Sequence, residues 1–153
     1  MDAQESRHIT DLRDSDIVVG VDGSPSSKAA LRWALAEAKL RCARVQAVAC
    51  WEFPLYYGWP PGVPYEDFAG MAGKALSQAV QEAIGFDGPE VEVLETVVGS
   101  HPAQVLIDAS SHAALLVLGS RGHGGFAGTL LGSVSQHCAQ RAHCPVVVVR
   151  GAS

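Results

Sequence analysis

Four residues near the C-terminus have the types and spacing of a loop that could bind a phosphate group. Gly119 and Gly122 follow the apolar run 115–118, and after nine further residues comes the pair Gly132-Ser133. Glycine leaves backbone N–H groups accessible, and the first turn of a helix has N–H groups without intrahelical partners. A strand, a loop with small side chains and a helix N-terminus in succession therefore predict a phosphate-binding loop.

The charge distribution favours an anion at this loop. The net charge of the 153 residues is −5, yet all sixteen Asp and Glu lie at or before Asp108. Residues 1–108 contain eight Lys and Arg against these sixteen acids (−8), whereas residues 109–153 contain three Arg and no acid (+3). A bound polyanion would meet no carboxylate from the loop's own segment, although chance in so short a segment stays open. An acidic chain without a dense basic patch also argues against a nucleic-acid partner.

The composition is that of one globular domain, with 48% hydrophobic and 18% charged residues. No apolar stretch approaches the roughly 20 residues of a membrane span, and the polar N-terminus has no signal-peptide core. We therefore expect a soluble, cytoplasmic protein with no membrane partner. Residues 1–15 are polar and aperiodic, which predicts a flexible tail before a domain over 16–151.

The cysteines form no C-x-x-C pair, so we expect reduced thiols packed as small apolar residues. They are Cys42, Cys50, Cys138 and Cys144. Two of them follow a histidine, at 137–138 and 143–144. Six residues on a helix turn through about 600°, so the two His-Cys pairs point to different sides and we predict no metal site.

Hydrophobic periodicity predicts alternating strands and helices. The expected strands are 17–21, 45–50, 91–98, 115–118 and 146–149, and the expected helices are 25–41, 66–84, 102–110 and 133–141. This alternation predicts an α/β fold with a parallel sheet covered on both faces. We expect a five-stranded open sheet of order 3-2-1-4-5, in which strand 91–98, with its alternating acids, lies at an edge.

Two helix starts carry sequence signals. Ser24-Pro25 supplies an N-cap and a first-position proline for helix 25–41, whose inward face is expected to include Trp33. Ser133 and Gln136 have the spacing of a capping box, so Ser133 is the expected N-cap of the last helix.

The predicted strand order brings Asp22 and Gly119 to one crevice, because they end the two strands at the switch point. Asp22 either contacts the ligand, which we favour, or caps the nearby helix. The Pro/Gly segment 51–65 holds six of the ten aromatic residues. We expect these to cover apolar core, with a lid over a bound base as the alternative.

Other phosphate-binding motifs do not fit. A P-loop needs a lysine beside its last glycine, and no lysine follows Lys74. The run Gly122-x-Gly124-x-x-Ala127 follows the fourth strand rather than the first, and no acidic residue comes after it to bind a ribose. NAD is therefore excluded as the predicted ligand.

The sequence resembles the universal stress protein family, in its ATP-binding branch, from about residue 15 to 150. The matching stretches are VGVDGS at 19–24, LVLGSRG at 116–122, GSVSQH at 132–137 and CPVVVVR at 144–150. The family's signature G-x2-G-x9-G-(S/T) is complete as Gly119, Gly122, Gly132 and Ser133. One departure is Ala114, where relatives often have an aspartate. The resemblance implies the adenine-nucleotide α-hydrolase-like fold and ATP as ligand.

By resemblance, the signature residues with Val134 and Ser135 surround the ribose and phosphates, Asp22 lies at the nucleoside end, and the backbone near Cys50 meets the adenine. Arg121 and His123 either contact phosphate or are solvated. The complete expected site is Gly20, Val21, Asp22, Cys50, Leu118, Gly119, Arg121, Gly122, His123, Gly132, Ser133, Val134 and Ser135.

The function expected is a nucleotide-responsive regulatory module. The glycine loop contains no general base, and Mg²⁺ could bind only through Ser133, the phosphates and water, so ATP hydrolysis should be slow at most. AMP or cyclic AMP as ligand, or a nucleotide-free interaction protein, stay open. An ATP-pyrophosphatase-like adenylyl transferase is less supported, because it would need a serine- and glycine-rich loop after the first strand, and VDGS at 21–24 is a poor version of one. The edge valines 146–149 predict a homodimer, unless the N-terminal tail covers them.

Overall fold

The computed structural model describes residue 9 and residues 11–51, 65–85, 90–121 and 131–151. The strands are β1 (Ile17–Gly20), β2 (Val45–Cys50), β3 (Val93–Val98), β4 (Leu115–Gly119) and β5 (Val146–Val149). The helices are α1 (Pro25–Arg41), α2 (Tyr65–Ile84), α3 (Pro102–Ser110) and α4 (Ser133–Arg141). The element types and order agree with the sequence prediction, and most bounds agree within two residues.

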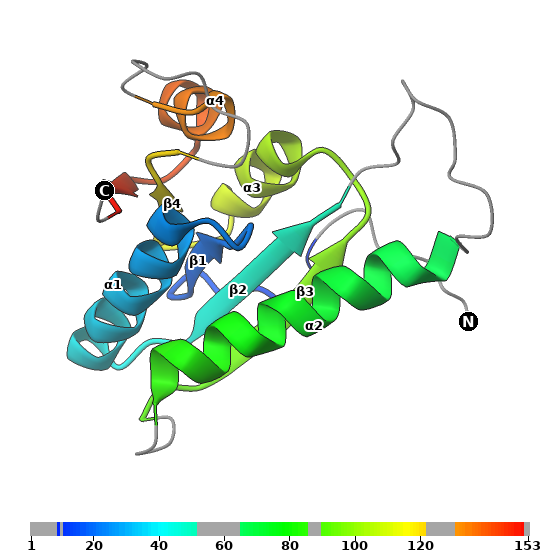
Figure 1. Cartoon of the computed structure of the whole chain (residues 1–153). Helices are drawn as coiled ribbons and strands as arrows, with labels where there is room; N and C mark the ends of the chain where they lie inside the picture. The colour runs from blue at the N-terminus through cyan, green and yellow to red at the C-terminus, as the bar shows by residue number, and fades with distance from the viewer. Residues whose placement is uncertain (1–8, 10, 52–64, 86–89, 122–130, 152–153) are drawn as a thin grey trace.

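The five strands form one parallel sheet of order β3-β2-β1-β4-β5, which confirms the predicted topology (Figure 1). β1 lies at the centre and pairs with both β2 and β4. Its register places Val19 beside Ala47 on one side and beside Val117 on the other. The crossover connections run through helices, as parallel strands require.

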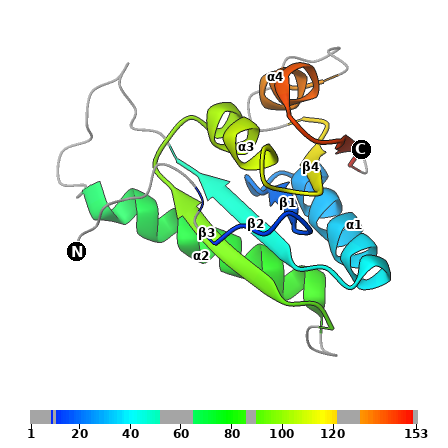
Figure 2. The same ribbon diagram turned by 180° about the vertical axis from the view of Figure 1, so that it is seen from behind.

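The strands are apolar because each face of the sheet is covered. Ile17 and Val19 face a core cluster under α1 and α2, whereas Val18 faces a second cluster under α3 and α4. Figures 1 and 2 show these helix pairs on opposite sides of the sheet. Leu31 of α1 is fully buried in the first cluster, and burial of such a side chain contributes about 1.5–3 kcal/mol.

Helix α1 begins as predicted, but its inward face is narrower. Ser24 is the N-cap, and its hydroxyl accepts a hydrogen bond from the N–H of Ser27 at 3.3 Å. The prediction that Trp33 belongs to the buried face is wrong, since Trp33 is 36% exposed. It lies about 100° around the helix from the fully buried Ala34, at the margin of the apolar stripe.

The predicted capping box of α4 is also wrong. Gly132 is the N-cap, and Ser133 is the first helical residue. The N–H of Gln136 donates to the carbonyl of Gly132 at 2.9 Å. The helix therefore begins one residue earlier than a capping box with Ser133 as its N-cap would require. As a glycine, the observed N-cap supplies no side-chain hydrogen bond to the first turn.

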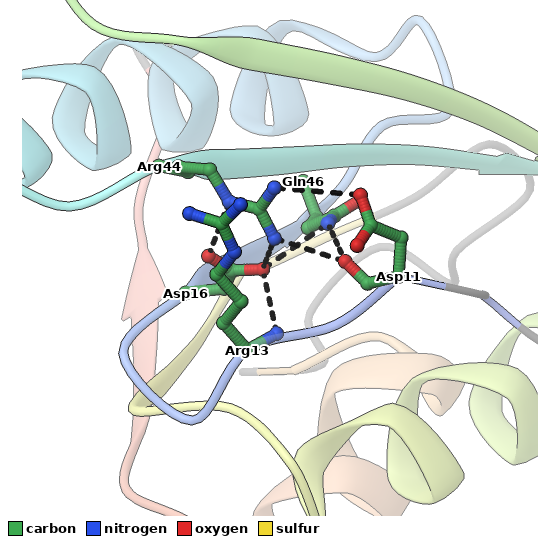
Figure 3. A network of polar contacts seen from close by, with 5 residues as sticks. All are labelled: Asp11, Arg13, Asp16, Arg44 and Gln46. Atoms are coloured by element: carbon green, nitrogen blue, oxygen red, sulfur yellow. Dashed lines mark hydrogen bonds and ion pairs between the residues drawn. The ribbon is translucent and has the colours of Figure 1, made fainter.

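A buried ion pair holds the amino ends of β1 and β2 together (Figure 3). The carboxylate of Asp16, fully buried, accepts from Arg44 Nε at 2.9 Å, from Arg44 Nη2 at 2.7 Å and from Gln46 Nε2 at 3.1 Å. The backbone N–H of Arg13 donates to it at 3.0 Å. Burial alone would raise the pKa of Asp16, but these hydrogen bonds and the Arg44 charge lower it overall.

Part of the segment predicted as a flexible tail packs onto the domain. Arg44 Nη2 and Gln46 Nε2 both donate to the backbone carbonyl of Asp11, and Ile9 is only 7% exposed. Residues 1–8 and 10 lie outside the described residues, so for them the tail stays a prediction.

Candidate functional site

The carboxyl ends of β1 and β4 lie side by side, as the predicted switch point requires. Val19 pairs with Val117, and continuation of this register places Val21 beside Gly119. The N–H of Val21 still bonds to the carbonyl of Val48 at 2.8 Å, so β1 leaves the sheet only at Asp22. The chain leaves β1 toward α1, on one face of the sheet, and it reaches α4, on the other face, after β4. Between the carboxyl ends of two such strands lies a crevice, where ligands of these folds bind.

The turn from β1 into α1 is held by Asp22. Its Oδ1 accepts from the N–H of Ser24 at 2.9 Å, and its own N–H donates to Ser27 Oγ at 3.2 Å. Gly23 has φ = +83°, a backbone conformation that favours glycine. The alternative that Asp22 is the helix cap is wrong, because Ser24 has that role. Asp22 braces the turn and is exposed at the crevice.

Gly119 is a glycine because the first turn of α1 packs directly against it. A Cβ atom there would lie 2.5 Å from Ser26 Oγ and 2.6 Å from the backbone of Ser26 and Ser27. Real side chains do not approach backbone atoms so closely, so any substitution must push α1 away from β4. The first glycine of the signature therefore has a packing role in addition to any role at a ligand.

Ser26 is a site residue that the sequence reasoning missed. Its hydroxyl donates to the carbonyl of Arg121 at 2.5 Å and accepts from the N–H of Arg121 at 3.2 Å. Ser24 Oγ donates to the same carbonyl at 3.2 Å. The α1 N-terminus thereby fixes the backbone of the loop that follows β4. The serine-rich stretch 24–27 was the available signal, but it indicated only a helix cap.

A second set of hydrogen bonds joins the two ends of the glycine-rich segment. The N–H of Gly132 donates to the carbonyl of Ser120 at 2.7 Å, and Ser135 Oγ donates to the same carbonyl at 3.3 Å. Ser135 is 3% exposed, and its hydroxyl also donates to the carbonyl of Gly132 at 3.2 Å. The N–H of Ser120 bonds to Val149 at 2.9 Å, which ties this set to β5. The Ser135 hydroxyl thus positions the loop ends.

The N-terminus of α4 begins at these loop ends. Its N-cap, Gly132, has no side chain, and its first turn contains no acidic residue. Ser133 is exposed and Val134 is half-buried. Unpaired N–H groups and the positive end of the helix dipole make such a terminus favourable for an anion.

The remaining predicted residues lie in or beside the core, so their backbone groups rather than their side chains are available to a ligand. Leu118 and Val21 are 4% and 5% exposed, and a Cβ at Gly20 would meet Leu106 and Leu118 at 3.0 Å. Cys50 ends β2, beside the carboxyl end of β1, where Gly20 pairs with Val48. Gly122 and His123 lie outside the described residues.

Trp51, the first aromatic residue of the segment 51–65, packs as predicted for a core-covering side chain. Its indole lies on Gly99, where a Cβ would be 2.8 Å from Trp51 Cζ2, and it stacks with Phe68 at a centroid distance of 6.4 Å. The side chains of the other five fall outside the described residues: Phe53, Tyr56, Tyr57, Trp59 and Tyr65. For these, both interpretations stay predictions.

The cysteines differ from one another in their surroundings. Cys138 is fully buried, and burial raises the pKa of its thiol to about 11, so it packs as the predicted small apolar residue. Cys42 contradicts that prediction, because it is exposed just beyond the end of α1 with φ = +56°. Within the described ranges, no three His, Cys, Asp or Glu side chains gather closely enough to hold a metal ion.

No helix in the described part of the chain combines the length and apolar character needed to cross a membrane.

The chain is similar, in sequence and in structure, to proteins of one family. The profile of the universal stress protein family matches residues 15–150. A universal stress protein of Mycobacterium tuberculosis is 38% identical over 137 residues, which are 88% of this chain and 44% of the relative. One of Mycolicibacterium smegmatis is also 38% identical over 137 residues, 88% of this chain and 45% of the relative. The chain spans less than half the length of these relatives.

Solved structures show the same fold. A universal stress protein from Lactobacillus plantarum superposes with a TM-score of 0.70 at 24% identity, over 92% of this chain and 100% of that one. A universal stress protein in complex with cyclic AMP superposes with a TM-score of 0.58 at 26% identity, over 92% and 99% of the two chains.

Proposed function

Since the chain belongs to the universal stress protein family, we propose that it binds an adenine nucleotide, ATP in the first place, in the crevice between β1 and β4. The observation that carries this proposal is that the chain after β4 is bonded both to the turn of the exposed Asp22, through Ser24 and Arg121, and to the N-terminus of α4, through Ser120 and Gly132. The structural neighbour solved with cyclic AMP supports an adenine nucleotide as the class of ligand.

The charges and backbone groups suggest an orientation. The phosphates lie at the first turn of α4, where Ser133, Val134 and Ser135 have N–H groups at the positive end of the helix. We expect the carboxylate of Asp22 to accept from a ribose hydroxyl, on the side away from those phosphates. The adenine then lies toward the end of β2, against the backbone near Cys50.

The proposed role is regulatory, with at most slow hydrolysis. The segment that holds the phosphates has no carboxylate to coordinate Mg²⁺ or activate water. Mg²⁺ would be held by the phosphates, water and Ser133. Without an activated nucleophile, positioning alone accelerates phosphoryl transfer little.

We propose that the active form is a homodimer joined through β5. This strand is an edge of the sheet, and all four of its valines are half-buried within one chain. Pairing with a second β5 would satisfy the outward backbone groups and cover these side chains.

The test is the identity of the nucleotide. The purified chain is denatured, the released nucleotide is identified by chromatography, and refolded protein is titrated with ATP, AMP and cyclic AMP by calorimetry. We expect ATP to bind, and Asp22→Asn to weaken all three ligands about tenfold, the loss of roughly one charged hydrogen bond. Asp108→Asn, on the exposed surface of α3, is the matched control. No released nucleotide and no heat at millimolar ligand would support the nucleotide-free alternative instead.

A further inference from the structure

A groove runs between α2 and β3, on the side of the sheet that α1 and α2 cover. Its volume is about 510 Å³, within the range of known ligand sites. It is lined by Gly70, Gly73, Lys74, Leu76, Ser77, Glu95 and Val97. α2 and β3 lie side by side in both views (Figures 1 and 2). β3 is two strands away from β1, so this groove is separate from the proposed nucleotide crevice.

The groove borders a free backbone edge. The carbonyl of Glu92 accepts from the N–H of Val45, and the carbonyl of Val98 accepts from the N–H of Trp51, at 3.0 Å each. The even-numbered residues of β3 therefore direct their backbone groups toward β2. In a parallel ladder the alternate residues then direct their N–H and C=O groups the other way. These are Val93, Glu95 and Val97, and in the described part of the chain no strand pairs with them. Two of the three also line the groove, so a strand added here would place alternate side chains over it.

The groove has room for one apolar side chain of such a strand. Its floor includes Leu76, which is 1% exposed, and Val97. A Cβ at Gly73 would lie 3.7 Å from Val97 Cγ2, in ordinary contact, and a Cβ at Gly70 would meet nothing within 4 Å. Beside Gly70 and Gly73 the helix therefore leaves space next to the strand. About one turn further along, Ser77 Oγ donates to Glu95 Oε1 at 2.5 Å and closes that end of the groove.

The charges at the β3 edge indicate which kind of segment could bind there. Glu90, Glu92 and Glu95 are all exposed along it, against Lys74 as the groove's cation. Lys39 already pairs with Glu90 at 2.5 Å. A second copy of β3 would bring glutamate against glutamate, which is unfavourable across strands. A basic segment would be attracted.

We propose that the β3 edge and its groove bind an extended basic peptide segment of a partner protein by strand addition. Main-chain hydrogen bonds to Glu95 and Val97 hold the segment. One apolar side chain lies over Gly73, and a Lys or Arg two residues away, on the same face of the added strand, faces Glu95. The glutamates also keep the edge from pairing with acidic copies of the same chain.

The probe is a fluorescein-labelled Thr-Lys-Thr-Val-Thr-Lys-Thr-amide, in which the valine and both lysines share one face of the strand, with anisotropy as the readout. We expect saturable binding that weakens with salt, and none by the peptide with Glu in place of Lys. Gly73→Leu fills the groove while improving helix propensity, and should weaken binding about tenfold or more. Ala75→Leu, on the exposed side of the same helix, should bind normally.

Two further comparisons separate strand addition from general attraction to an acidic protein. Glu95→Lys should weaken binding far more than Asp108→Lys on α3, and the peptide N-methylated at alternate residues should not bind. Equal effects of the two lysine variants, normal binding by Gly73→Leu, or retained binding of the N-methylated peptide would each overturn the proposal. None of these measurements requires a nucleotide.

Discussion

Individual residues of the site are constrained by contacts that their sequence motif does not reveal. Gly119 is part of the phosphate-loop signature, yet the structure shows that it is also the point where α1 touches β4. Asp22 is both exposed at the crevice and hydrogen bonded within its own turn. A substitution at either position therefore changes packing or turn geometry together with any ligand contact.

Gly119→Ala should destabilise the fold by about 1–3 kcal/mol, because the added Cβ overpacks the α1–β4 contact. Urea denaturation of the nucleotide-free protein measures this. Gly70→Ala is the matched control, since open space surrounds that position and alanine favours the helix by up to about 1 kcal/mol. Equal stability of the Gly119→Ala variant and wild type would contradict the packing role.

Asp16→Asn should cost about 1–3 kcal/mol at pH 7, since it leaves the buried Arg44 only the longer, more exposed ion pair with Asp11 at 3.4 Å. The pKa of Asp16 is lowered on folding from 3.8, so its carboxylate stabilises the fold above that pH. This contribution is lost as the pH falls through the lower folded-state pKa. The difference in unfolding free energy between wild type and variant should therefore shrink below pH 3.8. Urea denaturation of both proteins at pH 7 and in acid measures this difference. A constant difference would argue against the ionised pair.

At the scale of elements, the loop after β4 depends on a helix that is distant in sequence. Ser26 belongs to the first turn of α1, and its hydroxyl makes both a donor and an acceptor hydrogen bond with the backbone of Arg121. The Ser120 carbonyl joins the same loop to α4. Two helix N-termini thus hold one loop at the switch point of the sheet.

Ser26→Ala removes this connection and should lower the affinity for AMP about threefold to tenfold, the equivalent of one hydrogen bond. Calorimetry at a temperature well below the melting point separates this effect from unfolding. Ser77→Ala, which removes an exposed hydroxyl on α2, is the control. A loss of stability without a loss of affinity would limit Ser26 to a structural role.

The whole molecule is an open sheet with two edges that differ in character. β3 carries Glu95 and is preceded by Glu90 and Glu92, whereas β5 is four valines. The carbonyls of Pro145 and Val149 accept from β4, so Val146 and Val148 direct their backbone groups outward. The β5 edge is therefore the side suited to pairing with an identical chain.

Val148→Pro should convert the dimer to a monomer, because it removes an outward N–H without touching the ladder to β4. Sedimentation equilibrium measures the change. Val147→Pro, one residue away, removes an inward ladder bond and should instead destabilise the fold. A Val148→Pro protein that is still dimeric would place the interface elsewhere.

Periodicity and spacing along the chain were enough to predict the strands, the helices and the segment that holds the glycine loop, because these depend on near neighbours in sequence. The strand order was expected from the α/β fold class that their alternation predicts. Only the tertiary structure decided that Gly132 rather than Ser133 begins the last helix and that Ser26 anchors Arg121. It also decided that Trp33 is exposed and that α2 leaves a groove beside β3. These features depend on contacts between separate segments of the chain. Such contacts leave no regular spacing in a single sequence from which they could be predicted.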